Sequence, residues 1–330
     1  MISTTARNST TVRSQGALRL ARAALHAAYV LSEDLGTSFA ERLFTSPRRY
    51  PRPERERVVL ASARSFSIPV TLRSPRCNGQ QVEVAAWRWG IGPTVLLVHG
   101  WEGRGSQLGA LVEPLVTAGM SVVTFDAPAH GDSPGHRLYL TDFADTIADV
   151  ADAVGPLHAT VAHSFGCAGL LLAHARAGLD VARNVMIAPN VVIDELFEMF
   201  ARKVGLDDAD RTLLEHNISV RNGIALESLQ LERLVATRDA GLLVLHDRDD
   251  SEIPFTQAER LADAWPNARL ITTEGLGHRR ILREPAVIQE IVQAVREGVP
   301  LPASDLVREV DRLVDGLELR FGATRRSDPH

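Results

Sequence analysis

Cysteine is scarce in this chain. Only Cys77 and Cys167 occur among its 330 residues, and they do not form a CxxC pair. A scaffold held by disulfides and a zinc site built from thiolates are therefore poor matches to this sequence. So few cysteines are typical of proteins in a reducing compartment, and we expect the protein to be cytoplasmic.

Long apolar segments are also missing. The longest apolar stretch, Phe165 to Ala173, has about half of the roughly 20 residues that a membrane-spanning helix needs. We therefore expect no membrane span. Before Glu33 the chain has arginines but no acidic residue, a composition also found in organelle transit peptides. The interpretation we favour is a tail followed by an amphipathic helix from about Ala17 to Phe44.

An excess of positive charge is absent as well. The chain has 36 Lys and Arg against 41 Asp and Glu, a net charge of −5, and Lys203 is its only lysine. This balance gives no reason to expect nucleic acid as a partner. Five arginines and three prolines gather between Pro47 and Arg57, which we interpret as an exposed connector with solvated arginines.

What the sequence does contain is a regular alternation of strand and helix patterns. Residues 65–72 and 81–89 alternate apolar with polar side chains, as an antiparallel pair of strands would. Short apolar runs predict buried strands at 94–98, 121–125, 159–163, 185–188, 241–246 and 269–273. Helical patterns lie at 106–118, 141–154, 165–177, 285–297 and 305–321. This order predicts an α/β fold with a mostly parallel central sheet and helices on both faces.

One connection between these strands is unusually long. Residues 190–238 lack a strand pattern and begin with an apolar helix, which predicts a small helical cap above the sheet. Ile193, Leu196, Phe197 and Phe200 on that helix could line an apolar pocket for a ligand, or could simply pack the cap on the core. The expected organisation is an N-terminal region (1–60), a core (61–300) that contains the cap, and a C-terminal helix and tail (301–330).

A candidate nucleophile lies where a predicted strand meets a helix. In Ala162-His163-Ser164-Phe165-Gly166, small residues stand two positions on either side of a serine. Such a turn strains the serine backbone and lifts its hydroxyl clear of the sheet, although an N-capping serine would also fit.

A serine hydroxyl needs a base to become a nucleophile, and the base needs an orienting group. Three aspartates, Asp247, Asp249 and Asp250, follow the strand at 241–246, and His278 follows the last strand. Serine, acid and histidine therefore all come just after the carboxyl ends of strands, where parallel sheets bind their ligands.

With these motifs the chain resembles the α/β-hydrolase family, and in particular its serine esterases and lipases. The segments that carry the resemblance are 94–101 with the sequence TVLLVHGW, 126–133 with DAPAHGDS, the serine turn, and 246–254 with HDRDDSEIP. The family's HGxxDxxVP spacing favours Asp250 over the other two aspartates. Two departures from its usual pattern are Ala162 in place of a glycine and Asp247 after His246.

The resemblance implies a role for each residue. Ser164 attacks an acyl carbon, His278 moves the proton, and Asp250 orients the imidazole. The backbone N–H groups of Trp101 and Phe165 would form the oxyanion hole. We therefore expect a carboxylesterase-like serine hydrolase that acts on a small-molecule acyl substrate and needs no cofactor or metal.

Other functions remain open at this stage. Thioesters, lactones, carbon–carbon bonds and acyl transfer can all be served by the same three residues. A non-catalytic member of the fold is another alternative. Gly100, Gly103, Gly105 and Gly109 with Asp126 imitate a dinucleotide-binding unit, although they lack the GxGxxG spacing. The sequence does not indicate the oligomeric state.

Overall fold

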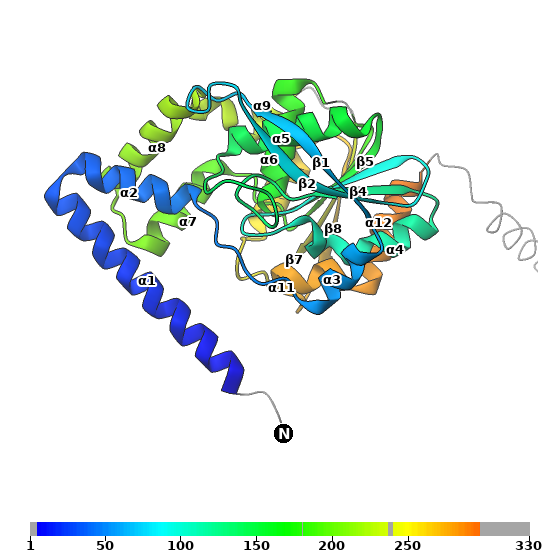
Figure 1. Ribbon diagram of the computed structural model, residues 1–330, viewed down its shortest axis with the longest axis horizontal. Helices are drawn as coiled ribbons and strands as arrows, with labels where there is room; N and C mark the ends of the chain where they lie inside the picture. The colour runs from blue at the N-terminus through cyan, green and yellow to red at the C-terminus, as the bar shows by residue number, and fades with distance from the viewer. Residues whose placement is uncertain (1–4, 180, 237–239, 298–330) are drawn as a thin grey trace, which may run out of the picture.

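The computed structural model describes residues 5–179, 181–236 and 240–297 (Figure 1). Within these residues one eight-stranded sheet has the order β1-β2-β4-β3-β5-β6-β7-β8. Strands β3 to β8 run parallel, whereas β1 pairs antiparallel with β2 and β2 antiparallel with β4. The strands are β1 (Arg64–Leu72), β2 (Gln80–Trp89), β3 (Thr94–Val98), β4 (Ser121–Phe125), β5 (Leu157–His163), β6 (Arg183–Ile187), β7 (Gly241–Asp247) and β8 (Ala268–Thr273).

Residue patterns explain which strands lie at the centre of the sheet. All residues of β3 and β4 are buried, because helices cover both faces of this part of the sheet. In β1 the buried residues alternate, with Ile68, Val70 and Leu72 facing the core. The predicted α/β fold with a mostly parallel sheet is therefore confirmed.

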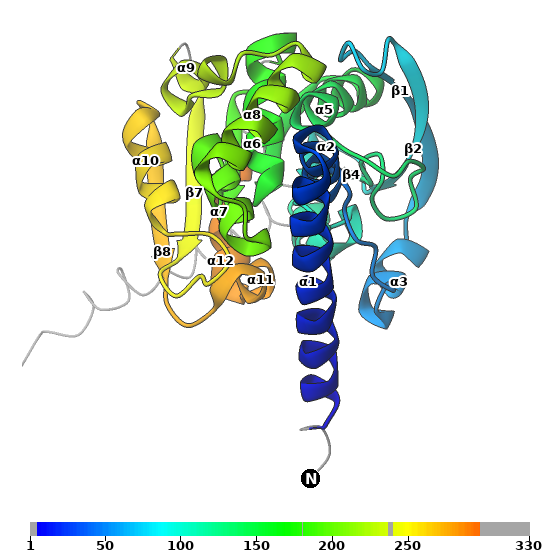
Figure 2. The ribbon, with the colours of Figure 1, turned by 90° about the vertical axis from the view of Figure 1, so that its left-hand side faces the viewer.

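Helices cover the sheet on both sides (Figures 1 and 2). One face packs against α5 (Leu140–Val154) and α6 (Phe165–Ala177), with α10 (Thr256–Ala264) beyond them. The other face packs against a 3-10 turn (Gly105–Leu111), α4 (Val112–Thr117) and α12 (Pro285–Arg296). The helix predicted over 106–118 is thus divided, because Pro114 suits the first turn of a new helix better than the interior of a long one.

The N-terminal region contains two long helices where one was predicted. They are α1 (Thr5–Leu31) and α2 (Glu33–Thr45), and the chain turns at Ser32, whose backbone is extended. The turn is tight at Gly36: a Cβ there would lie 2.3 Å from Cγ of Tyr29. Only glycine lets the two helices approach this closely.

The cap packs against these N-terminal helices. Between β6 and β7 lie α7 (Ile193–Val204), α8 (Asp208–Asn222) and α9 (Leu231–Val235), and α2 packs on α8 while α1 packs on α7. The Phe44 ring of α2 stacks on Phe197 at 4.9 Å and meets Phe200 edge-on at 5.0 Å. Arg22 of α1 donates from Nε to the carbonyl oxygen of Lys203 at 2.9 Å. The N-terminal helices therefore pack on the cap, although the two segments are far apart in the sequence.

The arginine-rich connector before α3 (Glu54–Ala61) differs from its predicted form. Arg49 donates to the carbonyl oxygens of Ala129, Ser133 and Gly135, and Arg52 pairs with the carboxylates of Asp126 and Asp132. The expectation of a solvated side chain was wrong for Arg52, which is half-buried, whereas Arg49 remains exposed while it bonds to these loops.

The helix predicted over 305–321 lies outside the described residues. Among the helices that are described, none combines the length and the apolar composition that a membrane crossing requires.

Candidate active site

Ser164 occupies a strained turn between β5 and α6. Its backbone has φ 55° and ψ −126°, a conformation that costs energy for any residue except glycine. The turn is held by backbone bonds from Ser164 N–H to the Ile187 carbonyl and from Asn190 N–H to the Ser164 carbonyl. A Cβ on Gly166 would lie 2.4 Å from the carbonyl oxygen of His99, so this position has room only for glycine. Ala162, the departure from the family pattern, fits without exposure in β5.

His278 and Asp250 meet beside this turn. His278 Nδ1 lies 2.8 Å from Oδ2 of Asp250, although the two residues come from loops after different strands. The other carboxylate oxygen of Asp250 accepts the backbone N–H groups of Glu252 and Ile253. Burial raises the pKa of Asp250, but hydrogen bonds with His246 and His278 outweigh it and hold the pKa well below its usual range. The carboxylate therefore stays ionised next to the imidazole.

The other two candidate aspartates hold loops instead. Asp247 Oδ2 accepts from the Thr273 hydroxyl at 2.6 Å and from Leu276 N–H at 2.9 Å. Asp249 Oδ2 accepts from Gly275 N–H at 2.9 Å. Both carboxylates thus anchor the loop that carries His278, and neither contacts its imidazole. Among the three candidates, only Asp250 bonds to the histidine.

His163 links the serine turn to the histidine. Its Nε2 lies 3.1 Å from the carbonyl oxygen of His278, and the two rings are 4.7 Å apart. Burial lowers the pKa of His163 to about 3, so its ring is neutral and donates from Nε2. No hydrogen bond joins the Ser164 hydroxyl to His278 among the described residues, but both side chains line the same cavity.

Two further histidines shape the loop after β3. His99 Nε2 accepts Ala127 N–H at 2.9 Å, and His130 Nε2 accepts Glu102 N–H at 3.2 Å. Burial lowers the pKa of His99 to about 4 and that of His130 to about 3, so both are neutral acceptors. They fix the loop that carries Trp101.

The Trp101 loop lies against the serine turn. The Trp101 and Phe165 rings meet edge-on at 5.6 Å. Within the described residues neither backbone N–H group, that of Trp101 or that of Phe165, donates a hydrogen bond to the protein. Both are therefore free to bind an oxygen atom of a ligand.

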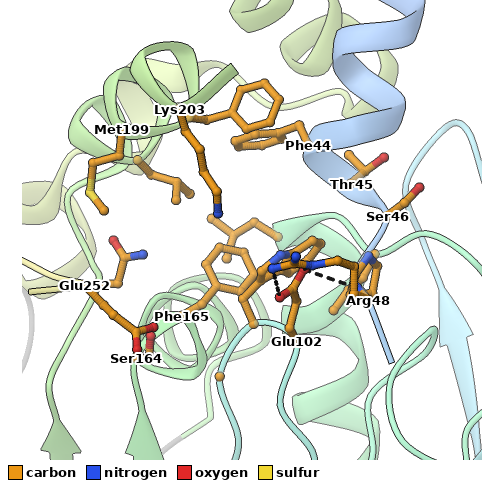
Figure 3. A pocket seen from close by; sticks show the side chains of 18 of the residues that line it. Phe44, Thr45, Ser46, Arg48, Glu102, Ser164, Phe165, Met199, Lys203 and Glu252 are labelled. Carbon is orange, nitrogen blue, oxygen red and sulfur yellow. Dashed lines mark hydrogen bonds and ion pairs between the residues drawn. The ribbon is translucent and has the colours of Figure 1, made fainter. Parts of the chain in front are cut away.

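These residues open into a cavity of about 1340 Å³. The cap and the N-terminal helices line it from above, and Ser164, Phe165 and the Trp101 loop form its floor (Figure 3). All four predicted pocket residues of α7 line it: Ile193, Leu196, Phe197 and Phe200. So do residues that the sequence did not indicate, among them Ala17, Leu18, Phe39 and Phe44 from α1 and α2.

Asn190 is another lining residue that sequence reasoning missed. Its side chain is buried, and its Oδ1 has no hydrogen-bond partner among the described residues. Its backbone N–H bonds to Ser164, so an unsatisfied amide lies next to the candidate nucleophile. Its position directly after β6, at the same edge as the other site residues, is the signal that could have identified it.

Comparison with known proteins places this geometry in a family. The sequence profile described as the Alpha/beta hydrolase family matches residues 95–290. The chain belongs to the α/β-hydrolase family. This hydrolase is 27% identical over 252 residues to a pimeloyl-[acyl-carrier protein] methyl ester esterase of Xanthomonas oryzae pv. oryzae, covering 64% of this chain and 98% of that protein. A shorter match, 35% identical over 65 residues, covers 20% of this chain and 25% of a protein of Pseudomonas savastanoi pv. phaseolicola that is named as a proposed carbamate hydrolase.

Solved structures share the fold of this hydrolase. An esterase of Pyrococcus furiosus superposes with a TM-score of 0.56 at 14% identity, covering 78% of this chain and 98% of that chain. At so low an identity the likeness concerns the fold alone. The match to the family profile begins at residue 95, after α3 ends at Ala61, so α1, α2 and α3 lie outside the matched residues.

The dinucleotide alternative finds no support in the geometry of this hydrolase. The carboxylate of Asp126, the candidate for a ribose, accepts Gly105 N–H at 2.8 Å and Asp132 N–H at 2.8 Å, and pairs with Arg52. It therefore holds two loops together. In the part of the chain that is described, no three His, Cys, Asp or Glu side chains gather as metal ligands would.

Proposed function

We propose that this α/β-hydrolase is a serine esterase that cleaves a small ester through an acyl-enzyme intermediate. The observation that carries the proposal is the 2.8 Å bond between His278 and an ionised Asp250, in the cavity whose floor presents the strained Ser164. Esterase names among the relatives of the chain support the same class of substrate.

In this proposal each group has one role. Ser164 attacks the acyl carbon while Nε2 of His278 takes its proton and later returns it to the leaving alcohol. Asp250 keeps the proton on Nδ1 and stabilises the imidazolium that forms. The free N–H groups of Trp101 and Phe165 bind the oxyanion, a kind of contact that contributes about 2.7–4 kcal/mol per donor. The bond from Ser164 to His278 forms when substrate binds, since such contacts are often loose in unliganded enzymes.

A fluorophosphonate probe tests the proposal, because it labels only an activated serine. We expect the native protein to be labelled and to hydrolyse p-nitrophenyl esters, and Ser164→Ala to lose labelling and at least about 10⁴-fold in kcat. Ser228→Ala removes an exposed hydroxyl that bonds only to the Ala225 carbonyl, and it should match the native protein. Labelling of Ser164→Ala, or a tenth of native activity in that variant, would remove Ser164 from the mechanism.

The apolar walls of the cavity support an acyl chain of short to medium length. The phenylalanines of α2 and α7 line one wall, and Phe165 and the Trp101 loop line the floor. We expect p-nitrophenyl esters from C2 to C16 to give the highest kcat/KM at intermediate length. A maximum at C16 would contradict this part of the proposal.

A further inference from the structure

The cavity is larger than a short ester requires. Its volume of about 1340 Å³ exceeds the roughly 300–1,000 Å³ typical of pockets for small molecules. An acyl group of medium length leaves part of it unoccupied. The charges that line the remaining space indicate what else binds there.

Cationic side chains outnumber carboxylates around this cavity. Three glutamates line it, and each is paired with an arginine that also lines it: Glu56 with Arg104, Glu102 with Arg48, and Glu252 with Arg279. Four more cations line the cavity and form no ion pair among the described residues: Arg42, Arg55, Lys203 and Arg283. In a chain with a net charge of −5, this local surplus of positive charge runs against the overall balance. A cleft lined by one sign of charge concentrates ligands of the opposite sign.

Lys203 is the cation that the fold directs into the cavity. It lies on the same face of α7 as Leu196 and Phe200, which come seven and three residues earlier, so it ends an otherwise apolar stripe. Figure 3 shows its side chain pointing from α7 into the cavity, toward the floor that carries Phe165 and Glu102. The Arg22 side chain holds this end of α7 by bonding to the carbonyl oxygens of Arg202 and Lys203.

Glu102, on the floor toward which Lys203 points, does not neutralise this lysine. Arg48 engages both oxygens of Glu102, at 2.7 and 2.9 Å, and Tyr50 donates its hydroxyl to the same group. Burial raises the pKa of Glu102, but Arg48 outweighs it and, with a smaller contribution from Lys203, lowers that pKa. The ammonium group of Lys203 therefore acts on Glu102 from a distance and remains available to a ligand.

We propose that Lys203 binds an anionic group, a carboxylate or a phosphate, carried by the ester substrate at the end remote from its scissile bond. This inference rests on the proposed esterase function and names its substrate class. The acyl part lies along the apolar face of α7, and the charge at its far end meets Lys203. Arg42, Arg55 and Arg283 add to the field that draws such a substrate into the cavity.

Two esters of equal length test the proposal. The mono-p-nitrophenyl ester of octanedioic acid carries a free carboxylate, and the corresponding p-nitrophenyl methyl diester does not. We expect the native enzyme to favour the acid by about tenfold or more in kcat/KM, since a hydrogen bond to a charged group is worth roughly that factor. The preference should shrink when salt is raised to about 0.5 M, because screening weakens exposed charges. An ω-phosphorylated p-nitrophenyl octanoate tells which anion is preferred.

Substitutions assign the preference to one residue. Lys203→Met should abolish it while leaving hydrolysis of the neutral diester within about twofold, and Lys203→Arg should restore most of it. Arg202→Met is the matched control, because Arg202 is the adjacent cation of α7, pairs with Glu198 and does not line the cavity. A native enzyme that hydrolyses the neutral diester equally well, or a Lys203→Met variant that keeps the preference, would overturn the proposal.

A binding measurement separates this inference from the esterase function. Calorimetry on Ser164→Ala should give tighter binding of monomethyl octanedioate, which carries one carboxylate, than of dimethyl octanedioate, and Lys203→Met in that background should make the two equal. Equal binding without the second substitution refutes the anionic site even if esters are hydrolysed. Failure of the native protein to react with esters and fluorophosphonate refutes the proposed function, whatever the binding of monomethyl octanedioate shows.

Discussion

Gly100 lies so close to Ser164 on the floor of the cavity that it has no room for a side chain. A Cβ atom on Gly100 would lie 2.9 Å from Cβ of Ser164 and 3.0 Å from the carbonyl oxygen of His163. The loop after β3 and the turn after β5 can therefore approach each other only because this position has no side chain. That approach also brings the loop that carries Trp101 against the turn that carries Phe165, whose ring lies 5.6 Å from that of Trp101.

The first prediction is that Gly100→Ala reduces activity far more than stability. The added methyl group pushes the Trp101 loop away from Ser164 and misplaces one oxyanion donor, which corresponds to about 100-fold or more in kcat. Ester hydrolysis and thermal unfolding measure the two effects. Gly16→Ala, at an exposed position in α1 with no atom within 4 Å of the new Cβ, is the control; it should leave activity unchanged and should not lower stability, since alanine favours a helix over glycine. Unaltered kinetics for Gly100→Ala would contradict the contact.

The second prediction separates the three aspartates. Asp250→Asn should lower kcat by about 10³–10⁴, because an amide cannot hold His278 in the required tautomer. Asp249→Asn keeps an oxygen that can accept Gly275 N–H and should stay within a few-fold of the native enzyme. Steady-state kinetics on one ester compare the two variants. If Asp249→Asn proves to be the more damaging, the assignment of the orienting acid fails.

The third prediction concerns stability below neutral pH. His99, His130 and His163 have pKa values lowered by burial to about 4, 3 and 3, against 6.5 for a histidine in the unfolded chain. The unfolded state therefore binds protons that the folded state does not, and the free energy of unfolding falls as pH drops from 6.5 to about 4. Each histidine contributes up to about 1.4 kcal/mol per pH unit.

Urea unfolding at pH 7, 6 and 5 measures this slope. In His130→Gln the amide oxygen can still accept Glu102 N–H, but the position no longer titrates, so the variant should show a shallower dependence. A free energy of unfolding that stays constant between pH 7 and pH 5 would mean that these rings take up protons without unfolding.

The fourth prediction compares a buried with an exposed ion pair. Arg104 and Glu56 are both buried, with Nε and Oε2 2.6 Å apart. Arg104→Met leaves the Glu56 charge without its partner and should cost about 3–5 kcal/mol in the free energy of unfolding. Arg57→Met breaks the exposed pair with Glu54 and should cost less than about 1 kcal/mol. Chemical denaturation tests both, and similar losses in the two variants would refute the difference in environment.

Much of the core could be predicted from local patterns. A strand buried on both faces, such as β3, has a short run of apolar residues in the sequence, and this run can be recognised without knowledge of its neighbours in space. The turn at Ser164 could be predicted because a close approach of strand and helix demands small residues at fixed spacing. Spacing also favoured Asp250, and the reason appears only in three dimensions, where the neighbouring Asp247 and Asp249 bond to the histidine loop instead.

The N-terminal region could not be predicted in the same way. Its helices are stabilised by contacts with α7 and α8, more than 140 residues later in the chain, and no periodicity of α1 or α2 indicates that partner. The bonds made by the connector arginines could not be predicted, for a related reason. A run of arginine looks solvated in sequence, but Arg49 and Arg52 lie beside carbonyl and carboxylate oxygens of a loop about 80 residues away.

Because α1 and α2 supply part of the cavity wall from outside the residues that match the family, that part of the wall is separate in sequence from Ser164, Asp250 and His278. Exchange of these two helices between related proteins would then change that part of the wall while leaving Ser164, Asp250 and His278 in place.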